Sequence, residues 1–517
     1  MPRYKPYDYN QLVMIPVSLE EQLVPGTLEY AIHHLIEERI DTSYFDERFC
    51  NDETGRSAYD PKVLLKIVLF GYSRGIISSR SLERACAENV TFMALACGQR
   101  PDHSTIAAFI SSMGEEISRL FTQVLLVCDE EGLLGGTHFS LDGLKLPSNA
   151  SKEWSGTFED LEKKKENLER KVREAIREHR AADKRERKRH DTERQRKEKR
   201  IRRLKKQAER IEKFLSENER KKGASGKEIQ SNVTDNESAK MATSHGVIQG
   251  YNANALVEEK HQVIVHAEAF GSGEDGTHME PMLEGAKEKL KCIGWNEPLK
   301  DKEISADTGY YSVKNLETCK ELEVDAYVPD PQFRKRDIRF KDAGRHRRSV
   351  DKRHERYKSK KRWFSVEDFR LDDLTGKLIC PAGEALYRNG KNFQTKDGYI
   401  ATSYRAPKRA CTGCHMRSKC LRSPDGTTRQ VRIFHGRRPG SITDEMKQKI
   451  DTVEGRKVYG KRLGIVEPVF GNIRVNKGLN RFTLRGLVKV NIQWIIYCLV
   501  HNIEKILHFG NTFAMAA

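Results

Sequence analysis

The feature that most restricts the fold of this chain is a long charged stretch, residues 158–222, that contains neither glycine nor proline. Apolar residues recur at heptad-like spacing near its two ends, while the middle, residues 183–200, has no aliphatic residue and no Phe, Tyr or Trp. This pattern predicts an extended helix or an antiparallel helical hairpin. Because strand patterns precede and follow the stretch, we interpret it as an insert in a larger domain.

The same stretch carries much of the positive charge. Of the 517 residues, 93 are Lys or Arg and 75 are Asp or Glu, a formal net charge of +18. Residues 158–222 hold 27 basic and 16 acidic residues, and residues 334–362 hold 15 and 4, so each segment nets +11 and the rest nets −4. Two basic segments on a near-neutral body favour a polyanionic partner, and we expect DNA. A solvated helix face is the alternative for either segment.

Other compositional features exclude whole classes of protein. The longest apolar run, around residues 494–500, is too short to cross a bilayer, and no apolar leader follows Met1. The 11 cysteines are an odd number and mostly scattered, which is typical of a reducing compartment. We therefore expect a cytoplasmic protein that is neither membrane-spanning nor secreted.

Outside the insert, the patterns predict helices followed by a mixed sheet. Residues 1–131 repeat apolar side chains at spacings of three and four, which predicts a helical domain and a candidate for DNA binding. Beyond them the order is strand, insert, strand, strand, helix, strand, helix, strand, as in ribonuclease-H-like α/β domains. The predicted strands are 137–142, 250–257, 262–267, 303–307 and 324–329, the helices 280–290 and 313–321. A last, amphipathic helix over 487–509 is expected to cover one face of the sheet.

Three carboxylates are candidates for chemistry. Asp142 ends the first predicted strand and Asp307 the fourth, and these strands are neighbours in the predicted sheet, so their ends converge. Glu467 is an isolated acid in a basic stretch far downstream. Three convergent carboxylates would repel one another unless cations neutralised them, which predicts Mg²⁺ or Mn²⁺. Taken singly, each is better explained as an ordinary residue at a strand end or helix start.

Several motifs, in order along the chain, resemble those of bacterial insertion-sequence transposases with a DDE domain, in particular the 1182 group. The motifs are Tyr59–Lys66 and Pro101–Ile106 in the helical domain, Asp142-Gly143 with Lys145 and Asn149, His245–Ala255, Asp307–Tyr310 with Asn315, and Tyr459–Arg474. The resemblance implies metal-dependent hydrolysis at the ends of the element and transfer of the freed 3′-hydroxyl into target DNA. A nuclease of the same fold that cuts without joining, and a non-catalytic DNA-binding descendant, are the alternatives.

The resemblance also implies roles for individual residues. Asp142, Asp307 and Glu467 would be catalytic and bind Mg²⁺. Contacts to DNA would come from five side chains, Lys145, Asn149, Tyr459, Arg462 and Arg474. The element's terminal repeats and the target DNA would be the partners, and pairing of two ends would need at least two subunits.

The glutamate motif departs from the family pattern. Four residues instead of three separate Arg462 from Glu467, and the final lysine of the motif is Arg474. Pro468 follows the glutamate directly, and a residue before proline is disfavoured in the α conformation. We therefore expect a helix to begin at Pro468, with Glu467 at its cap.

Four cysteines gather between the second basic segment and the glutamate motif. Cys411 and Cys414 form a C-x2-C pair, with Cys380 and Cys420 on either side. Four thiols at such positions suit tetrahedral structural Zn²⁺, for which His415 is a competing ligand. Free thiols in a small β subdomain are the alternative.

These observations predict five segments. They are a helical domain over 1–131, a ribonuclease-H-like core over 132–157 and 235–330, the basic insert and linker over 158–234, a basic and Cys-rich β insertion over 331–455, and C-terminal helices with the glutamate over 456–517.

Overall fold

The structure is a computed structural model that describes residues 18–48, 57–185, 191–223, 226–243, 246–340, 363–372, 374–395, 399–421, 423, 425–437 and 441–514. The chain forms two compact units. The first comprises Met1–Tyr310, Thr318–Ala326 and Val458–Ala517, and the second Tyr311–Glu317 and Tyr327–Lys457. Most of the second predicted basic segment, residues 341–362, lies outside the described residues.

Helices form the N-terminal part of the first unit, as predicted. They are α1 (Leu28–His34), η1 (Leu35–Arg39), η2 (Ser43–Arg48), α2 (Pro61–Ser73), α3 (Ser79–Glu88), α4 (Val90–Leu95), α5 (His103–Ser112) and α6 (Glu116–Glu130). The cap of α5 explains where that helix begins. The Asp102 carboxylate accepts hydrogen bonds from the backbone N–H groups of Ser104 at 2.8 Å and Thr105 at 3.1 Å, two donors that a helix start leaves without intrahelical partners.

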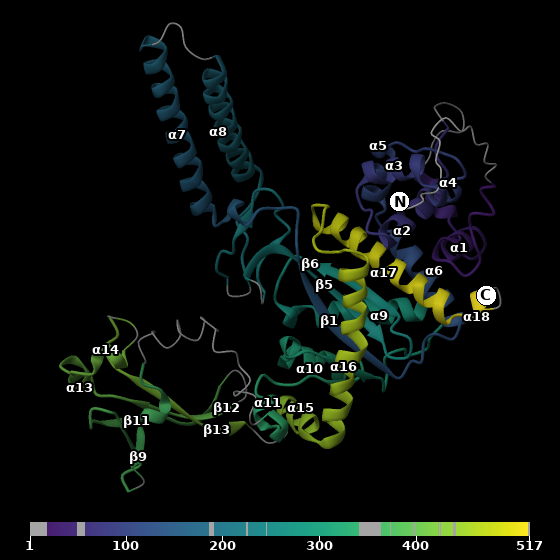
Figure 1. The fold of residues 1–517 in the computed structure, drawn as a ribbon. Helices are drawn as coiled ribbons and strands as arrows, with labels where there is room; N and C mark the ends of the chain where they lie inside the picture. The colour runs from purple at the N-terminus through teal and green to yellow at the C-terminus, as the bar shows by residue number, and fades with distance from the viewer. Residues whose placement is uncertain are drawn as a thin grey trace, which may run out of the picture. The chain divides into compact units, whose positions relative to one another are not determined.

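A six-stranded mixed sheet follows (Figure 1). Its strands are β1 (His138–Pro147), β4 (Ala239–Thr243), β5 (Gly246–Glu258), β6 (Ile264–Phe270), β7 (Glu303–Ala306) and β8 (Asp325–Tyr327). They are ordered β4-β5-β1-β7-β8, with β6 also on β5. β5 is antiparallel to β1 and β6, whereas β7 is parallel to β1. The first and fourth predicted strands are thus neighbours, and this mixed α/β fold is consistent with a ribonuclease-H-like domain.

The long C-terminal helix α17 (Leu487–Phe509) has the predicted bounds and lies between β6 and the helices α2 and α6 (Figure 1). Its Asn502 amide bonds the backbone N–H of Ile264 at 2.9 Å and its C=O at 2.8 Å, and Asn491 bonds Ala269 at 2.7 and 3.1 Å in the same way. These amides satisfy backbone groups that strand pairing leaves open on β6. With helices on its other side, α17 is buried well beyond the single face predicted.

The helix α16 (Val453–Gly471) corrects the prediction at Pro468. The helix does not begin at the proline but runs through Glu467 and Pro468. Proline cannot donate to the carbonyl four residues earlier, here that of Gly464. The Gln262 side-chain amide donates to that carbonyl instead, at 2.9 Å. Gln262 has a left-handed backbone (φ 60°), and His501 holds it through a 2.9 Å bond to its carbonyl.

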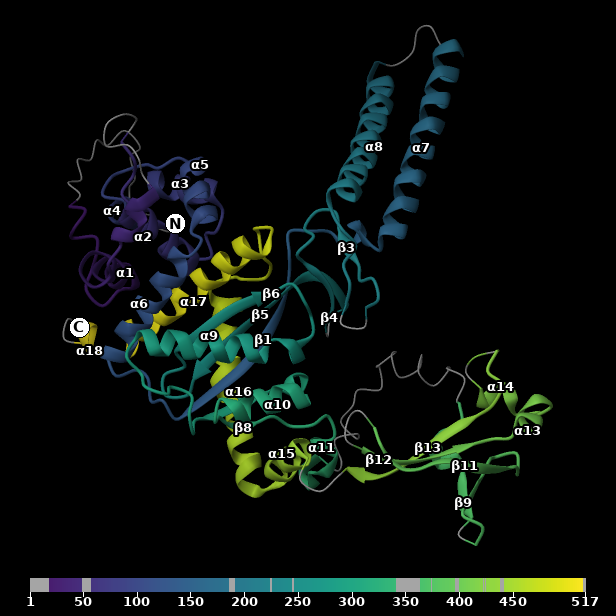
Figure 2. The ribbon, with the colours of Figure 1, turned by 180° about the vertical axis from the view of Figure 1, so that it is seen from behind.

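The charged insert is an antiparallel hairpin of α7 (Phe158–Arg185) and α8 (Asp191–Glu217), with the short strands β2 (Ser155–Gly156) and β3 (Ser231–Asn232) paired at its base (Figure 2). Five buried apolar side chains hold the base together: Phe158, Leu161, Ile211, Phe214 and Val233. An ion pair of 3.0 Å between Lys165 and Glu212 also joins the two helices. The hairpin alternative of the prediction is therefore the one observed.

The second unit contains a five-stranded antiparallel sheet ordered β13-β12-β11-β10-β9. Its strands are β9 (Arg370–Asp372), β10 (Lys377–Ile379), β11 (Ala385–Gln394), β12 (Tyr399–Arg405) and β13 (Gln430–Arg437). The remaining α-helices among the described residues are α9 (Met279–Cys292), α10 (Val313–Glu321), α11 (Phe333–Arg336), α13 (Lys408–Thr412), α14 (Arg417–Cys420), α15 (Ile442–Asp451) and α18 (Asn511–Ala514). Among the described residues, no helix is both long and apolar enough to span a membrane.

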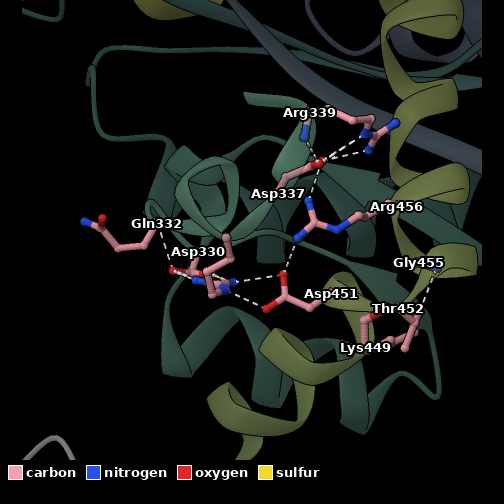
Figure 3. A network of polar contacts seen from close by, with 10 residues as sticks. Asp330, Gln332, Asp337, Arg339, Lys449, Asp451, Thr452, Gly455 and Arg456 are labelled. Atoms are coloured by element: carbon pink, nitrogen blue, oxygen red, sulfur yellow. Dashed lines mark hydrogen bonds and ion pairs between the residues drawn. The ribbon is translucent and has the colours of Figure 1, made fainter. Parts of the chain in front are cut away.

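Paired charges in the second unit join the segment after β8 to the start of α16 (Figure 3). Arg336 bonds Asp330 at 3.1 Å and Asp451 at 2.5 Å, and Arg456 bonds Asp451 at 2.8 Å and Asp337 at 2.6 Å. Hydrogen bonds from Arg339 and the charge of Arg456 lower the pKa of Asp337. The first turn of α16 is thus held by charge-assisted hydrogen bonds, which are stronger than neutral ones.

Candidate active site

The two predicted aspartates lie at equivalent positions of neighbouring parallel strands. Leu141 of β1 is in register with Ala306 of β7, so Asp142 and Asp307 are the next residues of the two strands. Asp307 directly follows β7, as predicted, but Asp142 does not end its strand. β1 continues to Pro147 because it remains paired with the longer β5 as far as Gly250.

Arg462 of α16 reaches both carboxylates. Its Nη1 donates to Asp142 Oδ2 at 2.7 Å, and its Nη2 is 3.7 Å from Asp307 Oδ1. The Arg462 side chain is 9% exposed, that of Asp142 24% and that of Asp307 47%. The other oxygen of Asp142 accepts the backbone N–H of Gly143 at 2.8 Å. Two acids therefore share one cation in a partly buried place.

Burial dominates the electrostatics of Asp142 and raises its pKa above the ordinary value. The Asp307 charge raises it further, while Arg462 and the Gly143 N–H favour the ionised form and oppose the shift. A partly buried carboxylate beside a second acid gains most from a nearby cation.

A buried polar layer lies against Gly143 that the sequence did not reveal. A Cβ at this position would lie 2.6 Å from Asn254 Oδ1 and 2.7 Å from Asn252 Oδ1, so only glycine fits beside the two amides. Asn252 bonds Asp275 at 2.6 Å, and Asn254 bonds Tyr310 at 3.1 Å. The sequence feature that could have predicted this layer is the two-residue spacing of Asn252 and Asn254, which places both on one face of β5.

His278 completes this layer as a neutral side chain. Burial lowers its pKa to about 4. Its Nδ1 accepts from the amide of Asn254 at 3.2 Å, so Nε2 carries the proton and donates to Ser272 Oγ at 2.7 Å. The Phe270 ring stacks on the imidazole at 4.1 Å. The histidine thus anchors the amides that contact Gly143, next to Asp142.

The third predicted carboxylate is placed differently from the other two. Glu467 lies on α16 five residues beyond Arg462, which corresponds to a rotation of about 140° around the helix, and it is exposed. Among the residues that the structure describes, no group of three or more His, Cys, Asp or Glu side chains is arranged to hold a metal ion. The structure therefore brings together Asp142, Asp307 and Arg462, with Glu467 on another face of α16.

Comparison with known proteins identifies the chain at the level of its domains. Residues 379–507 match a family model described as a transposase DDE domain, and residues 17–112 match one described as a transposase domain, DUF772. The chain has the typical architecture of insertion-sequence DDE transposases. The resemblance seen in the sequence is thereby confirmed. No curated protein and no solved structure matches the chain.

The transposase DDE match includes Glu467 but begins after both aspartates in sequence. The structure describes all five side chains predicted to contact DNA. Two of them are already engaged, because Lys145 lies 3.5 Å from Asp275 and the Asn149 amide donates to the carbonyl of Thr483 at 3.0 Å.

The motif residues around Arg462 have distinct surroundings. Tyr459 is half-buried, with its ring centroid 5.7 Å from the Arg462 guanidinium carbon. Arg474 is exposed, in a short π-helical turn, η9 (Asn472–Asn476), that follows α16. Arg481, which the prediction did not include, is also exposed and donates to Asn149 Oδ1 at 3.2 Å.

The four predicted zinc ligands share one cavity of the second unit. All four are half-buried free thiols that line this cavity, which is otherwise largely apolar: Cys380, Cys411, Cys414 and Cys420. The backbone N–H of Glu384 donates to Cys380 Sγ at 3.3 Å. Burial raises the pKa of Cys420, and the three neighbouring thiols raise it further. The four described thiols line one cavity but are not arranged to hold a metal ion, so zinc at them stays a prediction.

Proposed function

We propose that this chain is a transposase that cuts DNA at the ends of an insertion sequence and joins the freed 3′ ends to target DNA. The observation that carries the proposal is the position of Asp142 and Asp307 on adjacent parallel strands, both directed at one cation. The same chain matches the family models of a transposase DDE domain and of a second transposase domain. Phosphodiester chemistry at such a pair needs divalent metal.

The two aspartates fit a divalent cation. The Arg462 guanidinium is a stand-in, since a single positive group already contacts Asp142 at 2.7 Å and lies 3.7 Å from Asp307. Mg²⁺ is commonly bound through one or two carboxylates together with waters and substrate phosphates, so two aspartates suffice as protein ligands for one ion. Glu467 is proposed as a further ligand once DNA is bound. Mg²⁺ or Mn²⁺ would polarise the phosphate and lower the pKa of the attacking water.

The reaction consists of two displacements at phosphorus. In the first, a water oxygen bonds to phosphorus and the bond from phosphorus to the 3′ oxygen breaks, which leaves a 5′-phosphate and a 3′-hydroxyl. In the second, this 3′ oxygen attacks a target phosphate and displaces the target's own 3′ oxygen. The N–H of Gly143 orients the Asp142 carboxylate for these steps. The backbone at Asp142 is also held in place, because β1 pairs with β5 both before and after this residue.

Contact with the DNA backbone is proposed for the hairpin, on α8 rather than α7. Between residues 196 and 206, eight Lys or Arg side chains accompany a single acid, and all eight are exposed. On α7, by contrast, several surface bases have acidic partners on the same helix, such as Arg170 with Glu174 at 3.1 Å. Positive charge concentrated along an exposed helix attracts phosphates independently of sequence.

A cleavage and joining assay with Mg²⁺ or Mn²⁺ tests the proposal. Wild type is compared with Asp142→Asn, Asp307→Asn and Glu467→Gln on DNA that carries the element's own ends. Loss of both cleavage and joining in all three, with DNA binding retained, is the expected result. Full activity of Glu467→Gln would remove that residue from the site. Cleavage without joining by the wild type would identify a nuclease, and binding without cleavage a non-catalytic descendant.

A further inference from the structure

Arg462 has an arrangement that its expected contact with DNA does not explain. The guanidinium is turned inward, with Nη1 on Asp142 and Nη2 toward Asp307. It is nearly buried, yet its Nε has no hydrogen-bond partner among the described residues. An arginine with a purely structural role would be expected to satisfy its buried donors.

One guanidinium does not meet the electrostatic requirement of the two acids. The three groups together still carry one net negative charge in a partly buried place. A divalent cation would supply twice the charge of Arg462 and would accept oxygen ligands directly. Both cations cannot occupy the space between the same carboxylate oxygens, so each must weaken the binding of the other.

We propose that Arg462 is the resident cation of the Asp142–Asp307 pair and is displaced when a divalent cation binds there. The inference rests on the proposed function, because it takes the two aspartates as metal ligands. Displacement frees the guanidinium to bind a phosphate of the DNA, the role that the sequence predicts for it. Arg462 thereby sets the metal affinity of the free protein and links metal binding to DNA binding.

The test measures binding of Mn²⁺ to the full chain without DNA, from the loss of the electron paramagnetic resonance signal of free Mn²⁺ at pH 8. The variants are Arg462→Gln and, as a matched control, Lys461→Gln. The control removes the same charge from the neighbouring position, where Lys461 pairs with Glu259 at 3.2 Å. A charge-assisted hydrogen bond is worth roughly 1.5–3 kcal/mol, so Arg462→Gln is expected to bind Mn²⁺ about 10- to 100-fold more tightly than wild type. Lys461→Gln is expected to stay within about twofold of wild type, because its partner is a surface pair.

The outcomes separate this inference from the proposed function. Unchanged or weaker Mn²⁺ binding by Arg462→Gln, with binding abolished in Asp142→Asn, would overturn the displacement and leave the metal site in place. Absence of Mn²⁺ binding in both wild type and Arg462→Gln would overturn the metal site and, with it, the displacement. Equal tightening in Lys461→Gln would show a general charge effect and refute the specific role of Arg462.

If circular dichroism shows that Arg462→Gln does not fold, a second variant tests the same proposal. Arg462→Lys keeps the charge, but a single ammonium lacks the two arms that reach both carboxylates. It is expected to bind Mn²⁺ with an affinity between those of wild type and Arg462→Gln. Binding no tighter than that of wild type by a folded Arg462→Lys would contradict the proposal.

Discussion

The basic face of α8 gives a prediction that can be worked out residue by residue. Each residue turns an α-helix by about 100°, so side chains spaced by three, four and three residues fall within about 80° of one another. Four basic residues of α8 have this spacing: Arg196, Lys199, Arg203 and Lys206. On α8, which packs against α7, Ile201 and Ala208 lie roughly opposite this basic face, and Leu204 and Ile211 lie about 100–120° from its centre. Replacing the four bases by glutamine therefore removes charge from the exposed side without touching the helix contact.

The size of the effect follows from counterion release. Each phosphate contact contributes about 0.9 to the slope of log K against log salt concentration. If all four side chains contact phosphates, the variant should lose about 3.6 from the slope. Because these contacts are to the phosphates of the DNA backbone, the change in slope should be the same for DNA of any sequence. Fluorescence anisotropy with labelled duplexes, from 50 to 200 mM salt, measures it.

A control with the same change in net charge makes the test specific. Five described bases of the hairpin have a carboxylate four residues away within 4.0 Å. Lys165 also pairs with the other helix, so the control uses the remaining four: Lys163, Arg170, Arg173 and Lys213. Their replacement by glutamine should alter the slope by less than one contact, since their charge is already compensated. Equal losses in the two variants, or no loss in the α8 variant, would refute the assignment of DNA contact to α8.

Three further predictions concern the core, helix α16 and the thiols. Gly143→Ala should cost about 1–3 kcal/mol in urea unfolding and reduce DNA cleavage, because its Cβ would collide with two buried amides; unchanged stability would contradict that packing. Gln262→Ala should destabilise the protein by about 1 kcal/mol, because the carbonyl of Gly464 loses its donor. In a Pro468→Ala background the loss should be smaller, since the N–H of residue 468 can then donate to that carbonyl. Additive effects in this double-mutant cycle would contradict the role of Gln262. Wild type purified under reducing conditions should contain stoichiometric zinc by atomic absorption, which Cys411→Ser with Cys414→Ser should remove; a zinc-free wild type would refute the site.

Local pattern was sufficient for much of the fold. Heptad spacing and the absence of Gly and Pro predicted the helices of the insert, and apolar spacing predicted α17 with its bounds. Alternating strands gave the order that makes β1 and β7 neighbours, and with it the meeting of Asp142 and Asp307. These features succeed because they depend on residues close in sequence or on the few topologies that a strand order permits.

The failures share one cause, which is a partner distant in sequence. Pro468 should have begun a helix, but Gln262, some two hundred residues earlier, bonds the carbonyl that the proline leaves open. Asp142 should have ended its strand, but β5 extends the pairing to Pro147. A local rule describes only the intrinsic conformational preference of a segment, and one long-range hydrogen bond is enough to override that preference.

The sequence by itself identified the candidate carboxylates, the two basic segments and the motifs that resemble those of DDE transposases. Only the tertiary structure decided which of these groups meet. It put the charge of Arg462 between Asp142 and Asp307, left Glu467 on another face of α16, and placed two asparagines of β5 against Gly143. The physical reason is that electrostatic and packing energies depend on distance in space, and spacing along the chain fixes that distance only within a single helix or strand.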